Sequence, residues 1–227
     1  FFSITHLNVQ LFADSEYQQS LVDYVDTVDG LERNEPAVIV LDFSFLHPSE
    51  KVERLSKLDT SVPIVCNTLI MSATTAKHIS PENAQIIGMP ILPHYFVRQK
   101  IVEYSLPIGV TAVPEVLAQF LAAIGKGGEK INDSIAGVFP RTLAMIVNEA
   151  AFAVQESVAT AEDIDTAMKL GTNYPKGPLA WCDEIGAEAI VAILDALARE
   201  YGSERYRVAT LLRRYAESGQ QFIPSSH

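Results

Sequence analysis

The sequence predicts an α/β domain followed by an all-α domain. In the first half, β-prone runs and helical segments follow one another as strand, helix, strand, loop and strand, an order typical of layered α/β folds. From about Gly109 onward, apolar residues recur every three or four positions, which indicates packed helices. The length of 227 residues suits one large or two small domains. We therefore expect two domains, residues 1–108 and residues 109–227.

Four β-prone runs define the predicted sheet. Asn8–Phe12 is a short run, and Ala37–Leu41 (AVIVL) is continuously apolar and rich in β-branched residues. A continuously apolar strand such as Ala37–Leu41 is expected to be buried on both faces, as in a parallel sheet. Residues 63–67 and 85–89 supply two further strands.

Two helices are predicted between these strands. Ser15 is suited to cap a helix over about residues 16–25. Pro48 is suited to begin a second helix, over residues 49–58, because its fixed φ angle is already helical.

The second half contains five predicted helices, over residues 113–124, 138–157, about 161–170, 187–201 and 208–218. Thr160 is an N-cap candidate, and Asp163 stands where a capping box usually has Glu. We expect Gly171 to end that helix, because Pro175, Gly177 and Pro178 prevent its continuation.

The composition excludes several classes of function. The formal net charge of −11 argues against binding to nucleic acid, which requires a basic face. No apolar run approaches the roughly 20 residues of a membrane span, and the first residues lack the pattern of a secretory leader. Cys66 and Cys182 have no metal-binding spacing, so we expect no metal and two reduced, buried thiols in a cytoplasmic protein.

A sequence signature runs from an Asn-Glu-Ala helical segment, through a DID-x-AM-x-x-G run, to a P-x-GPL-x-x-x-D-x-x-G run. Its residues are Asn148, Glu149, Ala150, Glu156–Ala159, Asp163, Ile164, Asp165, Ala167, Met168, Gly171, Pro175, Gly177, Pro178, Leu179, Asp183 and Gly186. This signature resembles the C-terminal domain of the 3-hydroxyacyl-CoA dehydrogenase family. Residues 202–219 resemble the closing helices of that family.

The resemblance implies an incomplete or eroded Rossmann-like domain joined to a helical dimerisation and substrate domain. It also implies the family reaction, the NAD-dependent oxidation of a 3-hydroxyacyl-CoA in fatty acid metabolism. An acyl-CoA-type substrate and a homodimer follow from the same resemblance.

The glycine-rich loop that holds the dinucleotide phosphates in such domains is missing from the sequence. Gly30 is the only glycine before Gly88, so the chain has no G-x-G-x-x-G motif. If Asn8–Phe12 corresponds to the second strand of the family, the loop belongs before residue 1. The loop has either been lost or lies outside this sequence.

The resemblance also assigns cofactor-binding and substrate-binding positions. Asp14 matches, one place late, the acidic residue that holds the adenosine ribose, and Lys51 matches a lysine near the cofactor. Asn67 and Thr68 persist at a strand end that binds substrate, but Leu69 replaces the serine of the family.

The catalytic positions are more strongly changed. The histidine that takes the proton from the substrate hydroxyl corresponds to Pro90, whereas the acid that orients this histidine is retained as Glu103. An asparagine of the substrate site corresponds to Pro140. A proline cannot accept a proton, and loss of a general base typically lowers the rate by about 10² to 10⁴.

Three hypotheses follow. The chain is a divergent family member that binds a CoA ester with weak or no dehydrogenase activity, a pseudoenzyme. Alternatively, His94, four residues after Pro90, replaces the missing base and the chain is an active dehydrogenase. The third hypothesis is a non-catalytic scaffold or partner subunit.

Overall fold

The computed structural model describes residues 7–13, 19–29, 31–32, 36–45, 47–58 and 62–223. The chain divides into two compact units, Phe1–Gly137 and Val138–His227. The first unit is α/β and the second is helical, which confirms the predicted fold class. None of the helices in the described part of the chain combines the length and hydropathy needed to cross a membrane.

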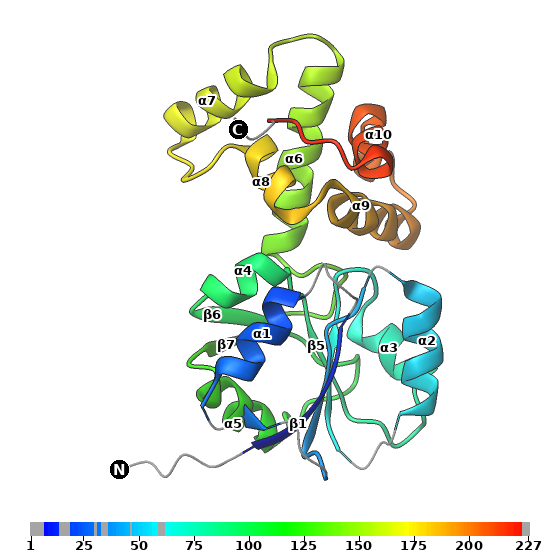
Figure 1. The fold of residues 1–227 in the computed structure, drawn as a ribbon. Helices are drawn as coiled ribbons and strands as arrows, with labels where there is room; N and C mark the ends of the chain where they lie inside the picture. The colour runs from blue at the N-terminus through cyan, green and yellow to red at the C-terminus, as the bar shows by residue number, and fades with distance from the viewer. Residues whose placement is uncertain are drawn as a thin grey trace. The chain divides into compact units, whose positions relative to one another are not determined.

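A five-stranded parallel sheet forms the centre of the first unit (Figure 1). Its strands are β1 (Leu7–Phe12), β2 (Leu31–Glu32), β3 (Ile39–Asp42), β4 (Ile64–Asn67) and β5 (Ile86–Met89), in the spatial order β2-β1-β3-β4-β5. All residues of β3, β4 and β5 are buried, which explains their continuous apolar sequence. The four predicted strands are thus confirmed within one or two residues.

Helices cover both faces of this sheet. They are α1 (Gln19–Thr27), α2 (Pro48–Lys57), α3 (Ala73–Ile79), α4 (Pro93–Arg98) and α5 (Glu115–Ala123). Figure 1 shows α1 and α4 on one face of the sheet and α2 and α3 on the other. Two apolar cores result, one around Leu21, Phe96 and Phe120 and the other around Leu55 and Ala76.

Two short helices of the first unit were not predicted. The hydroxyl of Ser72 accepts a hydrogen bond from Thr75 N and so caps α3. Pro93 occupies the first turn of α4, where its fixed φ is favourable. His94 therefore lies in a helix. The predicted cap Ser15 and the start of its helix lie outside the described residues, and α1 is described from Gln19.

A second, two-stranded parallel sheet also belongs to the first unit. Its strands are β6 (Ile101–Tyr104) and β7 (Gly127–Lys130), with α5 as the crossover between them. An antiparallel bridge between Gly88 and Ser105 links this sheet to β5. Residues 109–137 consequently lie in the first unit, and the division follows Gly137, later than the predicted boundary after residue 108.

The second unit comprises α6 (Phe139–Gln155), α7 (Ala161–Thr172), α8 (Pro178–Ile185), α9 (Ala187–Tyr201), the short helix Glu204–Tyr206 and α10 (Thr210–Ser218). Thr160 caps α7 as predicted, because its hydroxyl accepts from Asp163 N. The predicted end at Gly171 is wrong by a residue or two: α7 continues to Thr172, and Asn173 ends it with a φ of 58°.

Helix α8 was not predicted, and a buried carboxylate explains why it forms. Asp165 accepts hydrogen bonds from Leu179 N (2.8 Å) and Ala180 N (2.9 Å), the first turn of α8. Gly177 lies against this carboxylate so closely that any Cβ there would collide with Asp165. These contacts account for three positions of the signature.

Candidate functional site

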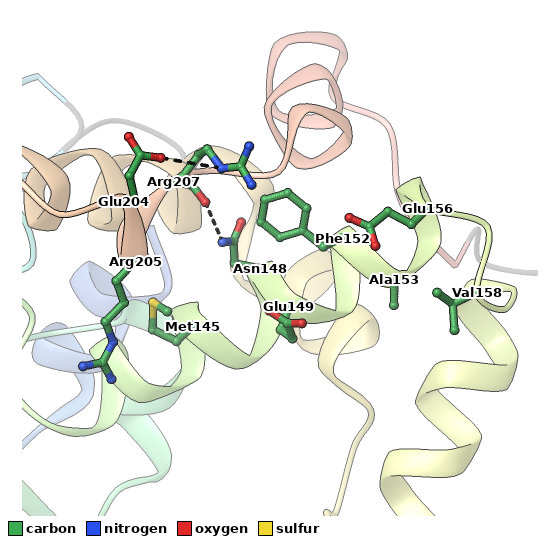
Figure 2. Close-up of a pocket in the computed structure, with 10 residues that line it drawn as sticks. All are labelled: Met145, Asn148, Glu149, Phe152, Ala153, Glu156, Val158, Glu204, Arg205 and Arg207. Carbon is green, nitrogen blue, oxygen red and sulfur yellow. Dashed lines mark hydrogen bonds and ion pairs between the residues drawn. The ribbon is translucent and has the colours of Figure 1, made fainter.

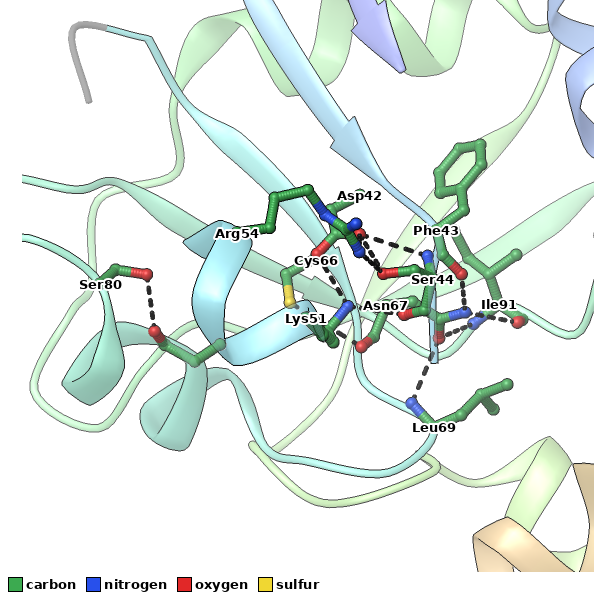
Figure 3. A network of polar contacts seen from close by, with 11 residues as sticks. Asp42, Phe43, Ser44, Lys51, Arg54, Cys66, Asn67, Leu69, Ser80 and Ile91 are labelled. Carbon is green, nitrogen blue, oxygen red and sulfur yellow. Dashed lines mark hydrogen bonds and ion pairs between the residues drawn. The ribbon is translucent and has the colours of Figure 1, made fainter. Parts of the chain in front are cut away.

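The amide of Asn67 holds together the carboxyl ends of three strands. Its Nδ2 donates to Phe43 O (2.9 Å) and Ile91 O (3.0 Å), and its Oδ1 accepts from Leu69 N (3.2 Å) and Ile91 N (3.1 Å). Figure 3 shows this amide between the segments that leave β3, β4 and β5. Because Asn67 is fully buried and its donors and acceptors are all used, its bonds fix the strand ends.

Thr68, the next residue, contains a hydroxyl with no hydrogen-bond partner among the described residues. The side chain is 1% exposed, and its methyl group faces Gly88, where a Cβ would lie 2.8 Å from Thr68 Cγ2. A buried hydroxyl without a partner costs about 1–3 kcal/mol. Among the predicted substrate-binding groups, the Thr68 hydroxyl is therefore the one that retains bonding capacity.

Glu103 and Pro90 meet at Gly137. Glu103 lies in β6 and is partly exposed, and Pro90 directly follows β5. Gly137 has a φ of 54°, and a Cβ there would collide with Oε2 of Glu103 and lie 2.6 Å from Cγ of Pro90. The structure thus brings together the two positions that the resemblance assigns to the acid and the histidine. At the position that the resemblance assigns to the histidine, the residue beside Glu103 is thus a pyrrolidine ring, which accepts no proton.

The alternative base, His94, lies in α4. It is the second residue of α4 and is partly buried. Glu103, the carboxylate that would orient a substitute base, lies in a different element, β6.

Lys51 belongs to a buried network at the end of β3. It is fully buried in α2, and its Nζ donates to Asp42 Oδ2 (3.0 Å) and Ser44 O (2.7 Å). Arg54 adds a second cation, with Nη2 3.4 Å from Asp42 Oδ1 and bonded to the hydroxyl of Ser44. Figure 3 shows all these groups converging on Asp42. A cofactor phosphate could contact Lys51 only if this network opened. Asp14, the other predicted cofactor-binding residue, lies outside the described residues.

The segment after β1 reads Ala13-Asp14-Ser15-Glu16. If β1 corresponds to the second strand of the family, an acidic residue that holds the adenosine ribose belongs in this segment, and the glycine-rich loop belongs before residue 1.

Several polar residues of the first unit were missed from the sequence. Asp133 accepts from Ala73 N (2.8 Å), Thr74 N (2.7 Å) and Ser105 Oγ (3.2 Å), and thereby ties α3 to the segments around β6. No sequence pattern joins residues that are about 60 positions apart. The Asp42–Lys51–Arg54 network joins residues only 9 and 12 positions apart, but it was missed because only the lysine matched a motif.

The second unit contains a groove of about 540 Å³ along α6 (Figure 2). Its lining includes Met145, Glu149, Phe152, Glu156, Arg205 and Arg207. The guanidinium of Arg207 lies 5.3 Å from the ring centre of Phe152, and its carbonyl accepts from Asn148 Nδ2 (2.9 Å). Asn148, a signature residue, also accepts from Ala209 N (2.9 Å), so its amide bonds the backbone of the segment before α10.

Comparisons with known proteins identify relatives of this chain. Residues 138–221 match the family described as 3-hydroxyacyl-CoA dehydrogenase, C-terminal domain. The 3-hydroxyadipyl-CoA dehydrogenase of Escherichia coli (strain K12) is 40% identical over 147 residues, 62% of this chain and 31% of that protein. The probable 3-hydroxybutyryl-CoA dehydrogenase of Bacillus subtilis (strain 168) is 31% identical over 206 residues, 88% of this chain and 71% of that protein.

Among solved structures, the (S)-3-hydroxybutyryl-CoA dehydrogenase of Ralstonia eutropha is similar at a TM-score of 0.69 and 27% identity. The likeness covers 86% of this chain and 68% of that chain. This chain thus spans under a third of the length of the E. coli relative and about seven tenths of the B. subtilis relative.

Proposed function

The chain belongs to the 3-hydroxyacyl-CoA dehydrogenase family, and from this premise we propose that it is a divergent member with weak or no dehydrogenase activity. It binds an acyl-CoA-type thioester at the carboxyl ends of β4 and β5. NAD is the cofactor of the family reaction, and the proline beside Glu103 supports a weakened or lost redox step.

The arrangement of Pro90, Glu103 and Gly137 carries this proposal. Hydride transfer from a secondary alcohol requires a group that takes the hydroxyl proton, and an imidazole suits this because its pKa lies near neutrality. Here the acid remains but a pyrrolidine ring lies beside it. Leu69 and Pro140 remove two further polar groups that the family uses to hold the substrate oxygen.

Thr68 supplies the test of thioester binding. Its buried, unpartnered hydroxyl can donate one hydrogen bond to a bound carbonyl oxygen. We expect Thr68→Val to weaken the binding of acetoacetyl-CoA about 5-fold, the value of one hydrogen bond of ~1 kcal/mol. Thr75→Val is the matched control, because the hydroxyl of Thr75 is already bonded to Ser72. Isothermal titration of both variants decides, and unchanged affinity in Thr68→Val contradicts the assignment.

Two other functions are kept as candidates. An active dehydrogenase that uses His94 predicts NADH-dependent turnover of acetoacetyl-CoA that His94→Ala abolishes. A scaffold or partner subunit predicts neither binding nor turnover. The scaffold is favoured by the full internal bonding of Asn67 and Lys51, two residues predicted to bind ligands.

We also propose that the helical unit forms a homodimer, as the family resemblance implies. The groove along α6 exposes both signs of charge, Glu149 and Glu156 against Arg205 and Arg207, so two copies can be complementary. Light scattering on the purified chain should give twice the 24.9 kDa monomer mass, and Arg205→Glu combined with Arg207→Glu should restore the monomer. The two buried, free thiols suit a cytoplasmic location.

A further inference from the structure

Two arginines of the helical unit lie around one tyrosine ring. Arg141, in the first turn of α6, donates through Nη1 to the hydroxyl of Tyr201 (3.3 Å) and through Nη2 to the hydroxyl of Tyr206. Its guanidinium carbon lies 4.7 Å from the ring centre of Tyr201 and 5.3 Å from that of Tyr206. The guanidinium carbon of Arg205 lies 5.8 Å from the same Tyr206 ring centre. Two positive charges therefore gather around a single aromatic side chain.

These two charges have no carboxylate partner among the residues that the structure describes. Arg141 bonds there only to the two neutral phenols, and Arg205 takes part in no side-chain hydrogen bond or ion pair. Arg213 of the same unit shows the contrast, because its guanidinium donates twice to Asp195 (3.0 and 2.7 Å). Although acidic residues outnumber basic ones by 28 to 17, this place therefore has an unpaired positive charge on each of two side chains.

Both guanidinium groups can be reached from solvent. Arg141 is partly exposed, Arg205 is exposed, and Tyr201 is 47% exposed. Figure 2 shows the side chain of Arg205 directed away from Glu204 and Arg207. Among the described residues, the bonds to the phenols use two of the five N–H donors of Arg141. The remaining donors are available to a ligand.

These features fit a phosphate dianion. A guanidinium group matches phosphate geometry, because two parallel N–H groups donate to two oxygens of the anion. The phenols hold the guanidinium of Arg141 in place without neutralising it, and the exposed side chain of Arg205 is free to donate to a further oxygen. Two cations favour a dianion over a monoanion such as acetate. We propose that Arg141 and Arg205 form a phosphate-binding site in the helical unit.

The phosphate can be a free ion or part of a nucleotide. The half-exposed ring of Tyr201 offers a face on which a base can stack, and such stacking should strengthen binding about 5-fold or more. Binding of AMP that is tighter than that of inorganic phosphate by this factor supports a nucleotide, and equal affinities support free phosphate. The site does not depend on thioester binding at Thr68. Failure of acetoacetyl-CoA to bind therefore refutes the proposed function alone, whereas failure of phosphate and AMP to bind refutes this site alone.

Isothermal titration of the full chain with inorganic phosphate, at about pH 8 where phosphate is a dianion, measures the affinity. Thermal unfolding in phosphate and in chloride of equal ionic strength supplies a second readout. With a Kd on the order of 1 mM, about 50 mM phosphate should raise Tm by roughly 5 °C. Phosphate also stabilises folded proteins without a specific site, so the part of the rise that is lost in Arg141→Gln and in Arg205→Gln is the part that belongs to this site.

Arg207→Gln is the matched control. Arg207 lines the same groove and belongs with Arg205 to the proposed dimer contact, but it lies 4.0 Å from Glu204. We expect Arg205→Gln to weaken phosphate binding about 10-fold, the value of one hydrogen bond to a charged group, and Arg207→Gln to leave it unchanged. Each variant is compared with its own chloride baseline, and if Arg141→Gln does not fold, the exposed Arg205 still decides. An unchanged Kd in Arg205→Gln, or an equal loss in Arg207→Gln, overturns the proposal.

Discussion

The two units retain the family sequence in different ways. In the helical unit the signature residues form structural bonds: Asp165 caps α8, Gly177 leaves room for its carboxylate, and Asn148 ties α6 to the segment before α10. In the α/β unit two of the matched residues, Asn67 and Lys51, are also bonded within the protein. Leu69 and Pro90 differ from the serine and the histidine that the family resemblance assigns to these positions.

This difference teaches that a family motif is retained for two separable reasons. A residue that satisfies buried backbone groups is required in every folded member, because its loss leaves them unpaired. A residue that acts only on the substrate can change without affecting the fold. The strength of the match over residues 138–221 is therefore evidence for the fold, whereas activity depends on the strand ends of the other unit.

The largest expected effect comes from the buried ion pair of the α/β unit. Lys51→Met leaves Asp42 buried beside only the partly exposed Arg54, so we expect a loss of about 3–5 kcal/mol of unfolding free energy. Lys57→Met, which removes a pair with both side chains about 70% and 67% exposed, is the control and should change stability little. Urea unfolding measures both, and equal effects would show that Lys51 is not part of the structural network.

Asp165→Ala should give the largest effect in the helical unit. It removes the acceptor of two N–H groups at the start of α8, at an expected cost of about 2–3 kcal/mol. Asp163→Ala, an exposed residue of the same helix, should cost much less. If urea unfolding showed a loss of unfolding free energy only for Asp163→Ala, the structural interpretation of the signature would be contradicted.

Gly137→Ala tests the meeting of Glu103 and Pro90. The positive φ and the collision with both side chains should cost about 1–3 kcal/mol. The same change in a Glu103→Ala background should cost less, because one of the two obstructing groups is gone. Additive effects in this double-mutant cycle would mean that Glu103 does not lie at Gly137.

The smallest expected effect concerns the thiol of Cys66, whose pKa is raised by burial to about 11. The unfolded thiol ionises near 8.5–9, so the folded chain holds its proton more tightly. Its contribution to stability is complete below about pH 9 and is lost as the pH rises toward 11. Unfolding curves of Cys66→Ala should lack this alkaline decline, and a thiol reagent should modify Cys66 in the native chain only slowly.

The sequence predicted the sheet and the long helices because their apolar patterns are local. Helices α3, α4 and α8 have only 7, 6 and 8 residues, too few for a periodic pattern, and depend on Ser72, Pro93 and Asp165 for their starts. The structure divides the chain after Gly137, because the pairing of β6 with β7 joins residues across a crossover helix.

The candidate site could be predicted in part from the sequence. Matching motifs identified Pro90 and Glu103, and the structure places both at Gly137. The partners of Asp133 could not be predicted, since they are set by the packing of segments about 60 residues apart.

The rate of NADH oxidation with acetoacetyl-CoA tests the central claim most directly, that the family fold remains here without the family base. The full chain and the B. subtilis relative would be assayed side by side under the same conditions. We predict a rate at least about 100-fold lower for this chain, the usual cost of a lost general base. A comparable rate that His94→Ala abolishes would contradict the account and establish an active dehydrogenase with a relocated histidine.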